Sequence, residues 1–142
     1  MNNVDAFPNM TAHNNKSTSC ATKDYNCIAW ALEKDDVWCW PDREGYSFWP
    51  IKNRKATQDV FIEMFSSFGY KCCENYTLEE GYQKIIIYMK DGNPTHASRQ
   101  LKNGKWTSKL GANVDIEHDC PEVLNGPVYG IATIIMRREN GT

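Results

Sequence analysis

The stretch THASRQLKNGKWTSKLG, residues 95–111, decides how the strands of this chain are arranged. Asn103-Gly104 separates two strand-forming runs, 95–101 and 105–110. An Asn-Gly pair between two such runs is the strongest short-range signal for a β-hairpin with a two-residue turn. The stretch therefore predicts an antiparallel hairpin that begins next to a histidine.

The length of that turn determines which side chains share a face of the hairpin. A two-residue turn pairs Lys102 with Lys105 across the two strands. In this register Ser108 and His96 lie on opposite faces, because side chains alternate along a strand. We therefore expect no contact between Ser108 and His96.

Helices are expected before this hairpin, and strands on both sides of it. Asp24 or Asn26 can cap a helix whose first turn contains Cys27, and Thr57 can cap a second helix that Gly69 ends. Further strands are expected at 84–89, which is continuously apolar, and at 128–138. The predicted fold class is α+β, with N-terminal helices packed on a mostly antiparallel sheet.

Length and composition predict one domain over residues 1–142, with an irregular N-terminal arm at 1–23 and a core at 24–138. The net charge of −2 argues against a nucleic-acid partner, which requires a concentrated basic surface. The longest strongly apolar run, 85–89, is too short to cross a membrane, so we expect a cytoplasmic protein. The six cysteines show no CxxC pair, which favours free thiols.

The best candidate for chemistry is a pairing of Cys27 with His96. A thiol at the start of a helix lies near unsatisfied amide protons, which lower its pKa and favour the nucleophilic thiolate. His96, at the start of a strand, is the natural base, and the side-chain amide of Asn26 could bind the developing oxyanion. The competing interpretation is that Cys27 is a small buried core residue and His96 a surface histidine.

A third residue should orient the imidazole of His96 by accepting its other ring proton. Asp115 lies on the face of His96 if strand alternation continues past Gly111, whereas His118 reaches that face only through a β-bulge. Both stay open as candidates. Their competing interpretations are a solvated carboxylate and a residue beside a helix cap.

Four Trp or Phe side chains fall within residues 37–50, a segment broken by Pro and Gly. Trp38, Trp40 and Trp49 could line a substrate groove or a partner surface, although a cover of core aromatics is the simpler interpretation. The alternative function is therefore a non-catalytic module that binds a protein through this loop. The sequence has no HExxH or CxxC spacing, so we expect no metal or cofactor.

Several motifs resemble those of a family of uncharacterised bacterial domains. They are YNCIAWA at 25–31, THA with Arg99-Gln100, WTSKLG at 106–111 and DIxH at 115–118. Cys27, His96 and His118 all match this family. A helix with a cysteine followed by a strand with a histidine is also similar, more distantly, to papain-like NlpC-type cysteine peptidases. That similarity implies a papain-like fold and a hydrolase or acyltransferase that cleaves an amide-type bond of a peptide or other amide substrate through a thioester.

Overall fold

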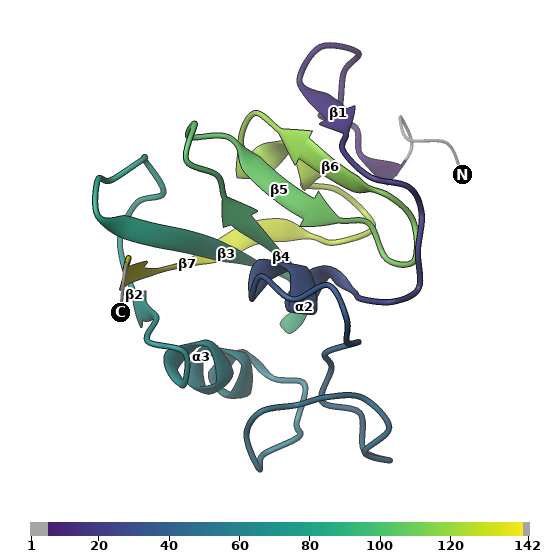
Figure 1. Cartoon of the computed structure of the whole chain (residues 1–142), viewed down its shortest axis with the longest axis vertical. Coiled ribbons are helices and arrows are strands. Elements are labelled where there is room, and N and C mark those ends of the chain that lie inside the picture. The colour runs from purple at the N-terminus through teal and green to yellow at the C-terminus, as the bar shows by residue number, and fades with distance from the viewer. Residues whose placement is uncertain (1–5, 141–142) are drawn as a thin grey trace.

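A seven-stranded sheet dominates the computed structural model, which describes residues 6–140 (Figure 1). The strand order is β1-β6-β5-β4-β3-β7-β2, and every neighbouring pair is antiparallel. The strands are β1 (Asn15–Ser17), β2 (Lys71–Cys72), β3 (Tyr82–Lys90), β4 (Asn93–Gln100), β5 (Trp106–Lys109), β6 (Asp115–His118) and β7 (Ile131–Glu139). The helices are α2 (Cys27–Ala31), α3 (Gln58–Ser66) and a 3₁₀ helix, η1 (Pro121–Leu124).

Strand β3 lies in the interior of the sheet, between β4 and β7. Its isoleucines Ile85, Ile86 and Ile87 are at most 2% exposed, because both faces of the strand are covered. A continuous apolar run is the pattern of a strand buried on both faces. The predicted buried central strand is therefore confirmed.

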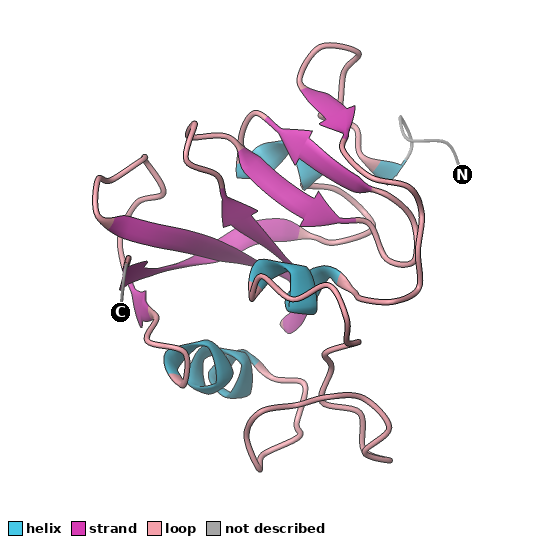
Figure 2. Cartoon of the chain, in the orientation of Figure 1, coloured by secondary structure: helices cyan, strands magenta, loops and turns pink. Residues whose placement is uncertain are grey.

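Each face of the sheet has its own hydrophobic layer. On one face, α2 and α3 pack against Ile85, Ile87 and Ala97. On the other face, Ile86 and Tyr88 pack with Trp106 and with Leu124 of η1. Figure 2 shows α2 in front of the strands and α3 below them.

The second predicted helix is confirmed as α3. The hydroxyl of Thr57 accepts a hydrogen bond from the backbone N–H of Val60 and so caps the first turn. Four apolar side chains recur on one face and are buried: Val60, Phe61, Met64 and Phe65. Gly69 follows the helix with a φ of +93°, a conformation that glycine adopts without strain.

The predicted fold class is wrong, including the papain-like (NlpC-type) arrangement. Helices α2 and α3 have only five and nine residues, and the frame of the fold is the seven-stranded sheet rather than a set of N-terminal helices. The local signals for helix starts at Asn26 and Thr57 are real, but neither start leads to a long helix. Most of the architecture comes from strand pairings between distant segments, such as β1 with β6 and β3 with β7, which local patterns do not encode.

The N-terminal segment contributes a strand to the sheet. Residues Asn15–Ser17 form the edge strand β1, which pairs with β6, where an irregular arm was expected. The first five residues of that expected arm lie outside the described part of the chain. Within residues 6–140, no helix has the length and apolar character needed to cross a membrane.

The register of the hairpin differs from the predicted one by a single residue. Leu101 N–H donates to Lys105 O at 2.7 Å, and Gly104 N–H donates to Leu101 O at 2.9 Å, so the turn has three residues. Gly104 has a φ of +87°, as expected for the last residue of a three-residue turn. The consequence is a change of face: Arg99 pairs with Thr107 instead of Ser108.

Candidate functional site

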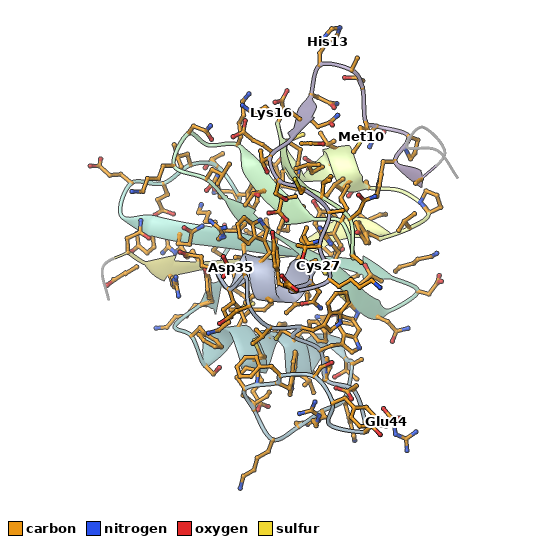
Figure 3. The ribbon with its side chains drawn as sticks, turned by 45° about the vertical axis from the view of Figure 1, so that its right-hand side comes forward. Met10, His13, Lys16, Cys27, Asp35 and Glu44 are labelled. Carbon is orange, nitrogen blue, oxygen red and sulfur yellow. The ribbon has the colours of Figure 1, made fainter. Side chains whose placement is uncertain are left out.

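Cys27 is the first residue of α2 and lies in the middle of the molecule (Figure 3). The side chain of Asn26 caps this helix by accepting a hydrogen bond from the N–H of Ala29. Cys27 packs in the same hydrophobic layer as Ala97 of β4 and is 8% exposed. The helix cap therefore places the thiol against the sheet.

Two opposing influences act on the Cys27 thiol. Burial raises its pKa to about 11, although backbone hydrogen bonds from Ala97, Ile28 and Cys27 itself and the charge of Lys109 act in the opposite direction. Desolvation is the largest influence because a thiolate loses its water inside the protein. Cys27 is therefore a neutral thiol near pH 7.

His96 is fully buried on the opposite face of β4. Its ring stacks on Tyr129 at a centroid distance of 4.0 Å and an angle of 10°. Its Nε2 lies 3.0 Å from Oγ of Ser108, whereas its Nδ1 is buried without a hydrogen-bond partner. Burial holds the pKa of His96 well below its usual value, and the charge of His118 lowers it further.

Cys27 and His96 lie in the two hydrophobic layers on opposite faces of the sheet. The amide that acts on the thiol belongs to Ala97, the residue directly after His96. Tyr129 stacks on His96, and burial raises the pKa of its phenol, with a smaller contribution from the charge of Cys27. Among the described residues, no hydrogen bond joins the thiol to the imidazole.

The candidate His118 reaches His96 through a serine. His118 Nε2 lies 2.9 Å from Oγ of Ser108, and its Nδ1 lies 2.9 Å from the carbonyl oxygen of Cys120. Burial lowers the pKa of His118 to about 4, so this ring is also neutral near pH 7. The structure therefore brings His96, Ser108 and His118 together on one face of the sheet.

The other candidate, Asp115, lies on the opposite face and does not contact His96. Its Oδ2 accepts a 2.6 Å hydrogen bond from the hydroxyl of Tyr25, and its Oδ1 is buried without a partner. Burial, together with this carboxylate, raises the pKa of Tyr25 to about 12. Asp115 pairs with Lys109 across the sheet, so both side chains face the layer of α2.

Asn26 has a structural task in this arrangement. Its Nδ2 donates to the carbonyl oxygen of Cys39 at 2.8 Å, and its Oδ1 accepts from the N–H of Cys39 and of Ala29. The amide expected to bind an oxyanion thus joins α2 to the aromatic loop.

The three expected tryptophans of the aromatic loop (37–50) are placed differently. Trp38 is 39% exposed. Trp40 and Trp49 both pack on Phe61 of α3, at centroid distances of 5.4 and 5.2 Å, and Trp49 is only 7% exposed. Trp38 is therefore the tryptophan of this loop that faces solvent most.

Arg54 holds the aromatic loop in a fixed shape. Its guanidinium donates to the carbonyl oxygens of Asp42 and Ser47 and forms an ion pair with the Asp42 carboxylate at 3.0 Å. The loop also closes on itself, because Phe48 N–H donates to the carbonyl oxygen of Trp38. The exposed aromatic side chains are thus carried by an ordered backbone.

Other candidate chemistry gains no support from the described residues. Residues 6–140 contain no cluster of three or more His, Cys, Asp or Glu side chains arranged to hold a metal ion. All six cysteines are free thiols, as the sequence predicted. Neither feature points to a second reactive centre.

Sequence reasoning missed two residues that contact His96. Ser108 was assigned to the wrong face because the turn was given two residues instead of three. The signal that could have found it is Gly104, since three-residue hairpins also place a glycine at the end of the turn. Tyr129 comes from a distant segment before β7, and no local pattern indicates its contact with His96.

Comparison with known proteins identifies one similarity. The model of a family described as "Domain of unknown function (DUF7689)" matches residues 16–137, which include every candidate site residue. No curated protein and no solved structure matches the chain.

Proposed function

We propose that this chain, which belongs to the DUF7689 family of domains of unknown function, is a cysteine hydrolase or acyltransferase that acts on an amide-type bond. The observation that carries the proposal is the buried Nδ1 of His96, which has no hydrogen-bond partner. Buried polar atoms are normally paired, so an unpaired imidazole nitrogen calls for a functional reason. A proton acceptor for the thiol of Cys27, on which the backbone amide of Ala97 next to His96 acts, is such a reason.

The two groups are in the protonation states that a general-base step requires. The raised pKa keeps Cys27 a thiol, and the lowered pKa keeps His96 a neutral imidazole with a free lone pair. Proton transfer from the thiol to the imidazole creates a thiolate and an imidazolium. Their opposite charges offset each other, which limits the cost of forming either charge in a buried site.

The reaction would then run through two acyl-transfer steps. As the thiol proton moves to Nδ1 of His96, Sγ of Cys27 bonds to the substrate carbonyl carbon. The carbon–nitrogen bond breaks, and His96 returns the proton to the leaving amine, which leaves a thioester on Cys27. Water or another nucleophile gives a proton to His96, attacks the thioester and releases Cys27 as a thiol.

Acyl transfer to Cys27 can be tested with p-nitrophenyl acetate, an activated acyl donor. Intact-protein and peptide mass spectrometry should find one acetyl group on Cys27, and His96→Gln should slow its formation by about a hundredfold. Cys39→Ser is a matched control, because Cys39 is also a buried thiol with a raised pKa but lies outside the proposed pair. Acetylation confined to the exposed Cys20 and Cys72 would contradict the proposal.

A second candidate is a module that binds a protein partner through the aromatic loop. Three large aromatic side chains of this loop are solvent-exposed, Trp38 and Phe48 at 39% and Tyr46 at 90%. Aromatic side chains on an ordered backbone lose little conformational entropy when they bind. Panning a peptide library against the protein should yield peptides that bind Cys27→Ala but not a Trp38→Ala/Phe48→Ala variant, and equal binding to both variants would exclude this surface.

A further inference from the structure

A chain of hydrogen bonds runs from His96 to a backbone carbonyl. His96 Nε2 lies 3.0 Å from Ser108 Oγ, and Ser108 Oγ lies 2.9 Å from His118 Nε2. His118 Nδ1 lies 2.9 Å from the carbonyl oxygen of Cys120. All three side chains are fully buried, so each contact needs a protein hydrogen.

The position of every hydrogen in this chain follows from its last member. A carbonyl oxygen only accepts, so His118 carries its hydrogen on Nδ1 and its Nε2 is an acceptor. The single hydrogen of Ser108 therefore points to His118. Ser108 must then accept from His96, which places the hydrogen of His96 on Nε2 and leaves Nδ1 without one.

A side branch joins Ser108 to Ser98 and Tyr88. Tyr88 donates its only hydrogen to the carbonyl oxygen of Pro121 at 2.6 Å, and Ser98 donates to the hydroxyl of Tyr88 at 3.1 Å. Ser98 Oγ also lies 2.6 Å from Ser108 Oγ. Because His118 Nε2 takes the hydrogen of Ser108, the hydrogen of Ser98 serves both of its hydroxyl neighbours.

We propose that Ser108 and His118 are positioning residues that hold His96 in the tautomer whose Nδ1 carries no hydrogen. This inference rests on the proposed role of His96 as the base for Cys27. No described carboxylate contacts His96, because Asp115 is bonded to Tyr25 on the opposite face. The serine and second histidine occupy the place that a carboxylate or amide takes in other catalytic triads.

The same chain supports His96 after it accepts a proton. An imidazolium donates more strongly from Nε2, and hydrogen bonds that all run in one direction strengthen each other. The other titratable groups facing these rings are the phenols of Tyr88 and Tyr129 beside His96 and the carboxylate of Asp119 near His118. Ser108 and His118 therefore affect both the tautomer and the charge of the base.

The decisive test is nitrogen-15 NMR of the histidine side chains in the full chain, labelled at histidine, at about pH 7.5. The wild type should show His96 as the Nε2–H tautomer and His118 as the Nδ1–H tautomer. Ser108→Ala should release His96 into a mixture of tautomers, whereas Ser108→Thr, which keeps the hydroxyl, should retain the wild-type signals. An Nδ1–H tautomer of His96 in the wild type would overturn the inference without any variant.

Alkylation of Cys27 by iodoacetamide separates this inference from the proposed function. Ser108→Ala should slow the alkylation on the order of tenfold, and Ser108→Thr should restore it. If the tautomers are as predicted but His96→Ala does not change the alkylation rate of Cys27, the proposed hydrolase is overturned and the hydrogen-bond chain still holds. A reactive, His96-dependent thiol with wrong tautomers would overturn the positioning role alone.

Discussion

Acidification from about pH 7.5 to pH 5 should destabilise the folded protein through His96 and His118. Burial lowers the pKa of His118 from its usual 6.5 to about 4, and it lowers that of His96 in the same direction. The unfolded chain therefore binds a proton at each of these residues in a pH range where the folded chain does not. The stability they contribute is fully present above about pH 6.5 and is lost as the pH falls towards 4.

The size of this effect follows from the His118 shift. A histidine with a pKa of 6.5 in the unfolded chain and about 4 in the folded chain lowers the free energy of unfolding by about 2 kcal/mol at pH 5. His96 acts in the same direction, since burial also lowers its pKa well below the usual value. The window ends at pH 5 because carboxylates begin to titrate below it.

Urea unfolding at several pH values measures this loss directly. His118→Gln removes one titrating ring, so its fall in stability between pH 7.5 and 5 should be about 2 kcal/mol smaller than that of the wild type, whatever the stability at pH 7.5. An unfolding free energy that does not change over this range would show that burial does not lower the pKa of either histidine in the folded protein. An equal pH dependence in wild type and His118→Gln would refute the assignment to His118.

Two further predictions use matched pairs of substitutions, read out as unfolding free energies. Gly130→Ala should destabilise the fold by roughly 3 kcal/mol or more, because a Cβ there collides with the carbonyl of Met89. Gly81→Ala should cost only about 1 kcal/mol, because Gly81 also has a positive φ but has open space around it. Equal costs would contradict this packing. Trp49→Ala should cost roughly 3 kcal/mol because the ring is buried, and Trp38→Ala about 1 kcal/mol or less because the ring is largely exposed. The reverse order would show that the loop packs differently.

Local chemistry predicted the elements that depend on neighbouring residues. Helix α3 begins after Thr57 because the hydroxyl of this residue caps the first turn. Strand β3 is buried on both faces because its successive isoleucines point to either side of the sheet. These signals act over a few neighbouring residues, so the sequence alone is enough to recognise them. The fold class failed because it depends on which strands pair across long separations, as β7 does with β3.

The candidate site was predicted in its types of residue but not in its geometry. Cys27 does begin a helix, yet burial raises the pKa of its thiol instead of lowering it, because desolvation outweighs the nearby amides. One residue in the hairpin turn decided the rest. The three-residue turn moves Ser108 onto the face of His96 and makes His118 a partner through it.

The rate of Cys27 alkylation by iodoacetamide as a function of pH tests whether His96 activates the Cys27 thiol. Mass spectrometry of the intact and digested protein would follow Cys27 in the wild type and in His96→Ala, with Cys39 as the buried reference thiol. If His96 activates Cys27, wild-type Cys27 reacts much faster than Cys39 near pH 7, and His96→Ala removes the difference. Equal inertness of Cys27 and Cys39 until the protein unfolds would show that Cys27 is a core residue and would contradict the account.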